Sequence, residues 1–288
     1  MLPTLTFVLP LPSSFNRQYF THRGQHILTP WSRRYRDLVA YRLHEMHWDD
    51  QLSDGFLDAA QRGHLSLLLH CYFETPLRRD LDSGLKIVQD AVVTRGLGID
   101  DARVVDVRLI KRIDPLRPRV EVSVDVIDGW DWECTDSEPI VPLAFRLPIP
   151  PSVNDQYVIV HGRRHRSAEL RRFRRQVQTY VVAQHLAEQL PASLRATRNP
   201  SYLAVYADFF FAAQQRRDID SGLKALLDAL CAPLGFNDNR VVDIHLTKRI
   251  TARQPYTLVQ LEPLADWVFD AQHPVLPPPT PDEPTAHE

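Results

Sequence analysis

The feature that most constrains this chain is an internal repeat. The segment RRDLDSGLKIVQDAV, Arg78 to Val92, recurs as RRDIDSGLKALLDAL, Arg216 to Leu230, with ten of the fifteen positions identical. Flanking segments recur in the same order: LPLPSSFNRQY with LPIPPSVNDQY, and GIDDARVVDVRLIKRI with GFNDNRVVDIHLTKRI. The offset falls from 138 to 137 between Lys224 and Gly235, so the second copy lacks one residue there. Because this period is far longer than a solenoid repeat, it indicates two homologous domains.

Each copy predicts the same elements. A first strand, a proline-rich turn and a short extended stretch with a turn precede a helix near 30–47 and 167–189. A buried strand, a second helix and two closing strands follow, with apolar and polar residues alternating in RVEVSVDV as in a half-buried strand. We therefore expect an α/β (α+β) fold of two homologous domains, each a small mixed β-sheet backed by two helices in the order βαβαββ. Together they would form an intramolecular pseudo-dimer.

Charge divides the chain into four parts. Residues 1–127 form copy one with a net charge of +1, and residues 128–138 form an acidic linker of −5. Residues 139–263 form copy two with a net charge of +7, and residues 264–288 form an acidic, proline-rich tail of −5. A basic domain suits a polyanionic partner, although a solvated basic surface gives the same count.

Compartment and partners are constrained by what the sequence lacks. No apolar run approaches the length of a membrane span, and no charged region followed by an apolar one opens the chain. The three cysteines are an odd number without metal-type spacing. We expect a cytoplasmic protein with ordinary thiols and no membrane partner.

Paired aspartates follow the buried strand in each copy, as Asp80 with Asp82 and as Asp218 with Asp220. In an extended chain, residues i and i+2 point the same way, and two carboxylates on one side suit Mg²⁺ or Mn²⁺. A helix N-cap is the structural alternative, but it explains one aspartate rather than two. A further acid follows a glycine turn in each copy, Asp101 and Asp238, whereas Asp100 is matched by Asn237.

Lysine is rare here, with four lysines against thirty arginines, and all four fall at repeat-equivalent places: Lys86 with Lys224, and Lys111 with Lys248. A compact ammonium differs from a planar guanidinium in size and donor geometry. Beside a metal, Lys86 and Lys224 could neutralise a phosphate or orient an attacking water. An i, i+4 pair with an aspartate is the alternative, worth only about 0.2–0.5 kcal/mol, and arginine would serve it equally well. For Lys111 and Lys248, a structural role and a phosphate contact both remain open.

Arginines flank the acidic segments. Two precede each aspartate pair, and the first helix of copy two carries four more in RSAELRRFRRQV. Beside a metal site in a basic domain, these favour a nucleic-acid backbone over a merely solvated face. The candidate DNA-binding residues are Arg78, Arg79, Lys111, Arg171, Arg172, Arg174, Arg175, Arg216, Arg217 and Lys248.

On these motifs both copies resemble the RusA family of Holliday junction resolvases. The family pattern has a proline-rich turn with Ser and Asn, then D-x-D-N-x-x-K-x-x-x-D-A, then G-x-x-D-D-x-x-V-V-D, then a lysine. The resemblance covers 3–127 and 141–262. Two departures stand out: Ser83 and Ser221 replace the Asn, and Asn237 replaces one acid of the doublet.

The resemblance implies an Mg²⁺-dependent endodeoxyribonuclease that resolves four-way DNA junctions by paired nicks. It implies that Asp80, Asp82 and Asp101 hold metal in one site, and that Asp218, Asp220 and Asp238 do so in the other. Lys86 and Lys224 would assist catalysis. Family members obtain two sites by dimerising, so this chain would obtain them by duplication.

Three rival functions remain open at this point. A junction-binding protein with one or both sites inactive would keep the same DNA contacts. A nuclease acting on forks or flaps would use the same chemistry. A nucleotide-sugar transferase also uses D-x-D, but it leaves the duplication, the later aspartate and the arginine-rich helix unexplained.

Overall fold

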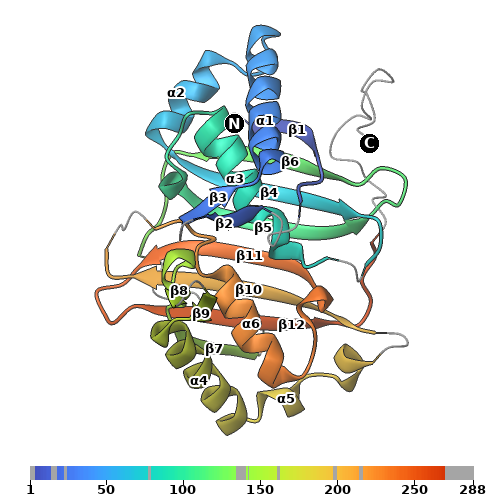
Figure 1. Cartoon of the computed structure of the whole chain (residues 1–288), viewed down its shortest axis with the longest axis vertical. Coiled ribbons are helices and arrows are strands. Elements are labelled where there is room, and N and C mark those ends of the chain that lie inside the picture. Colours follow the sequence, from blue (N-terminus) through green and yellow to red (C-terminus); the bar gives the residue numbers. More distant parts are fainter. Residues whose placement is uncertain are drawn as a thin grey trace.

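One mixed β-sheet runs through the whole molecule (Figure 1). The computed structural model describes residues 4–13, 18–22, 25–76, 79–133, 141, 143–160, 163–196, 200–213 and 217–269. Eight strands lie in the order β1-β6-β4-β5-β11-β10-β12-β7. Their bounds are β1 Thr4–Pro10, β4 His64–Phe73, β5 Val104–Ile113, β6 Arg119–Ile127, β7 Leu143–Pro148, β10 Tyr202–Phe211, β11 Val241–Ile250 and β12 Tyr256–Leu264.

The chain forms two halves with the same topology, which we call the first half (4–127) and the second half (143–264). In each half the first strand lies on the outside, and two parallel strands, β4 with β5 or β10 with β11, lie toward the middle. The predicted order of elements is therefore observed in both halves. The expectation of a separate small sheet for each copy needs correction, because the two four-stranded sheets join edge to edge.

The join is an antiparallel pairing of β5 with β11. Its register runs from Ile110 opposite Asp243 to Asp106 opposite Thr247, and these two pairs are exchanged by the repeat offset of 137. The edge that each half would leave open is thus covered by the other half, which removes an unpaired strand edge. Buried apolar side chains of both halves belong to one continuous core.

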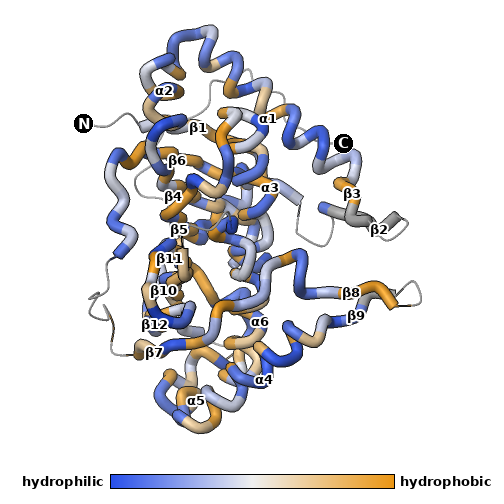
Figure 2. Tube along the Cα trace, turned by 90° about the vertical axis from the view of Figure 1, so that its left-hand side faces the viewer, coloured by the Kyte–Doolittle hydropathy of each residue, from blue (hydrophilic) through white to orange (hydrophobic). Residues whose placement is uncertain are grey.

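The main helices lie on one side of this sheet, as α1, α3, α4 and α6 show in Figure 2. Side-chain caps begin three of the longer helices: Thr29 accepts from Ser32 N, Ser53 from Phe56 N and Ser167 from Leu170 N. The helices are α1 Pro30–Trp48, α2 Asp54–Arg62, α3 Leu85–Gln89, α4 Ala168–Ala183, α5 Leu186–Gln189 and α6 Leu223–Leu234. Of these, α2 was not predicted. Within the described residues, no helix has the length and apolar character needed to cross a membrane.

The one-residue difference between the copies has a structural explanation. In the second half α6 is a regular helix that ends at Gly235, whose φ of 80° is the left-handed conformation that glycine adopts readily. In the first half α3 passes into a π-helix, Asp90–Gly96, before the equivalent Gly98 with φ 68°. A π-turn takes up one residue more than an α-turn, so the extra residue is absorbed and the next segment starts in the same place.

Two small hairpins complete the fold. They are β2 (Tyr19–His22) with β3 (Gln25–Leu28), and β8 (Tyr157–Val160) with β9 (Arg163–Arg166). Both project from the helical side of the sheet (Figure 2). They correspond to the short extended stretches with a turn that the sequence predicted.

Candidate active site

The turn that carries each aspartate pair packs against the proline-rich turn of the same half. A Cβ atom on Gly84 would lie 2.8 Å from Pro12 Cγ, and one on Gly222 would lie 2.5 Å from Pro150 Cγ. Only glycine allows this approach. In each half the repeated proline therefore packs against the repeated glycine, and this contact fixes the position of the aspartate turn.

Buried glutamines tie these turns together, and sequence reasoning missed them. Gln18 Nε2 donates to Ser13 O at 2.9 Å and to Ser83 O at 3.0 Å. In the second half Gln156 Nε2 donates to Ser221 O at 3.4 Å. The signal was present in the repeated N-x-Q-Y, which pairs these two glutamines in the alignment of the copies.

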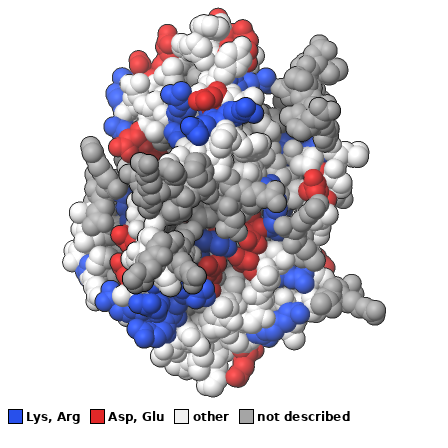
Figure 3. All heavy atoms as spheres, viewed as in Figure 1, with Lys and Arg blue, Asp and Glu red and all other residues white. Residues whose placement is uncertain are grey.

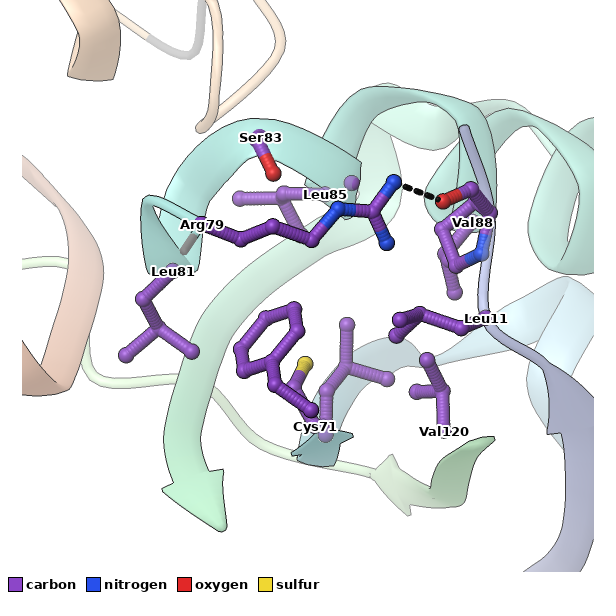
Figure 4. Close-up of a pocket in the computed structure, with 12 residues that line it drawn as sticks. Leu11, Cys71, Arg79, Leu81, Ser83, Leu85, Val88 and Val120 are labelled. Carbon is purple, nitrogen blue, oxygen red and sulfur yellow. Dashed lines mark hydrogen bonds between the residues drawn. The ribbon is translucent and has the colours of Figure 1, made fainter. Parts of the chain in front are cut away.

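The arginines directly before the aspartate pairs point inward. Arg79 extends across a small apolar pocket and donates to Pro12 O at 2.8 Å (Figure 4). Arg217 donates to Pro150 O and to Ser221 Oγ, the latter at 3.0 Å, and burial lowers the pKa of its guanidinium. Both side chains thus hold the turns in place in this structure. Arg78 and Arg216 lie outside the described residues.

The first acidic cluster, cluster A, surrounds the ammonium of Lys86. Asp90 Oδ1 lies 2.9 Å and Asp101 Oδ2 3.1 Å from Lys86 Nζ, both from the first half. Asp218 Oδ2 at 3.0 Å and Asp220 Oδ1 at 4.0 Å come from the second half. The predicted i, i+4 pair is present, but it is one contact among several.

The second cluster, cluster B, repeats this arrangement around Lys224. Asp238 Oδ2 at 2.7 Å and Asp228 Oδ1 at 3.2 Å come from the second half. Asp80 Oδ2 at 3.6 Å and Asp82 Oδ2 at 4.0 Å come from the first half. Figure 3 shows acidic side chains gathered near the middle of this face of the molecule.

Each cluster therefore combines both halves, whereas the resemblance groups the aspartates of one half together. Asp80 follows the end of β4 and Asp101 precedes the start of β5, and these strands are parallel. The two aspartates of one half thus lie toward opposite ends of these strands. Because β11 and β10 run antiparallel to β5, the end of β10 brings Asp218 to Asp101.

The two lysines at the centres of the clusters are protonated at neutral pH. Burial lowers the pKa of Lys86, but the carboxylates around it, Asp220 foremost, raise it more strongly, to well above the ordinary value. The same holds for Lys224, where Asp82 is the foremost carboxylate. These ammonium groups are therefore suited to neutralise negative charge and unsuited to accept a proton at neutral pH.

The aspartates that face the lysines from the opposite half are deeply buried. The side chains of Asp82 and Asp220 are 5% and 4% exposed. Burial raises the pKa of each to about 7, against the lowering by the neighbouring lysine. Burial and the carboxylate of Asp238 also raise the pKa of Asp80. Each cluster thus sets four carboxyl groups around one ammonium.

This donor set fits a hard divalent cation. Among the described residues, no three His, Cys, Asp or Glu side chains stand ready around a metal position; the ammonium lies among the carboxylates instead. Yet in the same part of the chain Asp82 Oδ1 and Asp220 Oδ1 are buried and receive no hydrogen bond. A buried acceptor without a donor is costly, and oxygen ligands of this kind are those that Mg²⁺ prefers.

The Asp100-to-Asn237 difference lies beside the clusters rather than in them. Asp100 Oδ1 accepts from Ala102 N at 3.0 Å, and Asn237 Oδ1 accepts from Asn239 N at 3.0 Å. Both side chains cap a short 3₁₀ turn, a task that an amide oxygen performs as well as a carboxylate. The change in the capping residue therefore leaves Asp238 and Asp228 in contact with Lys224.

The remaining lysines are buried. Lys111 and Lys248 are 0% and 2% exposed, and burial lowers the pKa of each to about 8. Lys111 Nζ donates to backbone carbonyls of Arg79 and Asn239, and Lys248 Nζ donates to that of Ala102. This geometry favours the structural alternative over the phosphate contact.

The arginines of α4 are placed differently. Arg171, Arg172 and Arg175 are exposed, and Arg174 NH1 lies 3.8 Å from Asp228 Oδ2 at cluster B. Figure 3 shows a basic patch at the end of the molecule that carries α4. The basic patch therefore lies beside a cluster of carboxylates, as a surface that guides a phosphate backbone toward a metal site would.

Part of the chain is similar in sequence to known proteins. Residues 148–262 match the family model described as Endodeoxyribonuclease RusA. The crossover junction endodeoxyribonuclease RusA of Escherichia coli K12 is 31% identical over 121 residues, which are 42% of this chain and 93% of that protein. The protein of that name from Enterobacteria phage 82 gives the same values. That of Escherichia coli O139:H28 is 32% identical over 108 residues, 38% of this chain and 82% of its own length.

Proposed function

The chain belongs to the RusA family of endodeoxyribonucleases, and from this premise we propose that it cuts four-way DNA junctions with two Mg²⁺-dependent sites in one polypeptide. Residues 1–127 and 139–263 would be tandem RusA-like domains that form a pseudo-dimer, joined by the linker 128–138. The main support is that clusters A and B have the same composition and that each draws carboxylates from both halves.

Each cluster would hold one catalytic site. Asp218, Asp220 and Asp101 would hold Mg²⁺ at cluster A. Asp80, Asp82 and Asp238 would hold it at cluster B. A bound Mg²⁺ would supply a Lewis acid for the phosphodiester and a water of lowered pKa.

The chain's own groups would do the rest of the chemistry. Lys86 and Lys224 stay protonated and would place a compact positive charge where the phosphate gains negative charge. The exposed arginines of α4 would hold the DNA backbone beside cluster B. Two sites in one chain would make paired nicks independent of protein concentration, unlike those of an obligate dimer of single domains.

The test uses the purified full chain with Mg²⁺ on four-way, forked, flapped and linear DNA labelled on each strand. We expect paired nicks in the four-way junction and no cutting without divalent metal. The double variant Asp82→Asn with Asp220→Asn should lose cutting but keep junction binding, because it removes one carboxylate from each cluster.

The matched control is Asp58→Asn with Glu188→Gln, which removes the same charge from exposed positions. Undiminished cutting by the Asp82/Asp220 variant would overturn the site assignment. Equal cutting of forks or flaps would leave the nuclease in place but replace the four-way junction as its substrate. Junction binding by wild type without any metal-dependent cutting would indicate a binding protein instead.

A further inference from the structure

The segment after the last strand of the first half crosses to the second half. Trp130 Nε1 donates to Lys248 O at 2.8 Å, and Ile250 N donates to Trp132 O at 2.7 Å. We call residues 130–132 the first clasp. It binds the end of β11, the strand of the other half that lies at the join.

The segment after the last strand of the second half makes the same contacts in reverse. Trp267 Nε1 donates to Lys111 O at 3.1 Å, and Ile113 N donates to Phe269 O at 3.3 Å. We call residues 267–269 the second clasp. The offset of 137 relates Trp130 to Trp267, so the two clasps are repeat-equivalent although their sequences barely match.

Side-chain contacts around the clasps repeat as well. The guanidinium of Arg249 lies over the Trp130 ring at 4.6 Å, and that of Arg112 over the Trp267 ring at 5.7 Å. An edge-on ring contact accompanies each clasp: His64 with Trp132, and Tyr202 with Phe269. Each clasp thus fixes the backbone of a strand end where a buried lysine sits.

The lysine under the second clasp bridges the two halves at cluster B. Lys111 Nζ donates to Arg79 O at 2.8 Å and to Asn239 O at 3.0 Å. Arg79 directly precedes Asp80, and Asn239 directly follows Asp238. One ammonium therefore joins the two backbone segments that bring the first half's and the second half's carboxylates together.

The lysine under the first clasp takes the equivalent place at cluster A. Lys248 Nζ donates to Ala102 O at 2.7 Å, and Ala102 directly follows Asp101. Lys248 lies on β11 of the second half, so this bond also crosses between the halves. The lysine that the repeat preserves at this position thus reaches the opposite half in both copies.

We infer that Lys111 and Lys248 are positioning residues. Lys111 holds the carboxylate-bearing segments of both halves in register at cluster B, Lys248 holds the Asp101 segment at cluster A, and the clasp behind each fixes the lysine's own backbone. The inference rests on the proposed function for its cleavage readout. A charge buried without a carboxylate hydrogen bond is costly to the fold. Arginine could not replace either lysine, because a guanidinium is larger and planar.

The principal test places Lys111→Met in two backgrounds. In Asp220→Asn only cluster B is complete, and Lys111→Met should slow single-turnover junction cutting on the order of a hundredfold, as small misplacements of catalytic groups do. In Asp82→Asn only cluster A is complete, and adding Lys111→Met should leave the rate unchanged. Junction affinity should be unchanged in both backgrounds.

A second measurement does not depend on cutting. Amide hydrogen exchange of Lys111→Met should rise in segments 79–82 and 238–240, and stay as in wild type in segments 217–220 and 101–103. If neither aspartate variant cuts DNA but exchange changes in this pattern, the proposed function fails and the positioning role stands. Trp267→Phe keeps an aromatic side chain but loses the donor to Lys111 O, and it should raise hydrogen exchange in the same segments by a smaller amount.

The matched control is Cys71→Ala, a buried change opposite Lys111 in the β4–β5 register. It should lower the free energy of unfolding without the local pattern. Equal slowing in both aspartate backgrounds, a uniform rise in exchange, or no change would overturn the inference. Weakened junction affinity at unchanged cutting rate would also overturn it, since that is the result of a lost phosphate contact.

Discussion

The two halves place equivalent sets of one lysine and four aspartates by different local means. The first half passes from α3 into a π-helix over Asp90–Gly96, where the second half has the regular helix α6. The first half caps its next turn with Asp100, and the second half does so with Asn237. Yet Lys86 Nζ lies 3.1 Å from Asp101 Oδ2, and Lys224 Nζ lies 2.7 Å from Asp238 Oδ2.

This comparison separates what the site needs from what the fold tolerates. The helix type and the capping residue differ between the halves, so neither is required for the clusters. The lysine, the paired aspartates and the later aspartate are kept in both halves, as are their contacts across the join. The constraint therefore acts on the positions of the charged atoms, while the helix and the cap between the lysine and the later aspartate differ.

Of the three changes that compare the halves, replacing the lysine at the centre of each cluster has the largest expected effect. Replacing Lys86 and Lys224 with arginine should slow single-turnover cutting by about tenfold or more, about 1.4 kcal/mol of barrier, because a planar guanidinium does not fit among four carboxylates. Each single replacement should impair only its own cluster. Arg95→Lys at an exposed pair is the control. A double arginine variant at wild-type speed would support a simple helix salt bridge instead.

The next effect tests whether the basic helix α4 of the second half binds DNA more strongly than α1 of the first half. Changing Arg171, Arg172 and Arg175 to Gln should weaken junction binding and reduce its salt dependence, by about 0.9 in logarithmic slope for each lost phosphate contact. The matched variant changes Arg33, Arg34 and Arg42 of α1, which are also exposed. Binding measured against salt concentration should show the smaller loss for α1. An equal loss from both helices would contradict the assignment of the basic patch on α4.

The smallest effect is expected for a deletion that converts the π-helix of the first half into an α-helix like that of the second half. Deleting the exposed Thr94 should let the π-helix continue as an α-helix, and the free energy of unfolding should change by about 1 kcal/mol or less. Cutting at both clusters should persist. Deleting Ala232 from α6, which has no residue to spare, should destabilise the protein more in denaturant unfolding. Equal destabilisation by both deletions would contradict the explanation of the offset.

Much of the fold follows from local sequence. The repeated motifs predicted two copies, and the alternation of Val120, Val122 and Val124 predicted a strand that is observed as β6. The strand is not half-buried as expected, because Glu121 and Ser123 on its other face are buried as well. Helix α2 was missed because the second copy has no matching segment to support it. The single sheet could not be predicted, because an edge strand carries no local signal of the strand that will cover it.

The sequence singled out the charged residues of the two clusters but did not predict which of them lie together. The sequence identified Lys86, Asp101 and Asp218 as charged residues of equivalent segments, and the structure brings these three together. Which aspartates meet depends on β5 pairing with β11, a contact between residues more than 130 positions apart. The inward role of Lys111 was also hidden, since burial of a lysine under a distant tryptophan leaves no local pattern.

The most direct test of the composite clusters compares two double variants of equal chemistry. Asp82→Asn with Asp238→Asn removes two carboxylates from cluster B and none from cluster A. Asp82→Asn with Asp101→Asn removes one carboxylate from each cluster, and both of these aspartates belong to the first half. The measurement is the distribution of uncut, singly nicked and doubly nicked junctions at dilute enzyme.

If the clusters combine both halves, the Asp82/Asp238 variant makes single nicks at the rate of Asp82→Asn alone, and the Asp82/Asp101 variant does not cut. If each half builds its own site, the results exchange: Asp82/Asp101 nicks one strand and Asp82/Asp238 is inactive. That exchange would contradict the central claim that each active site is shared between the two halves.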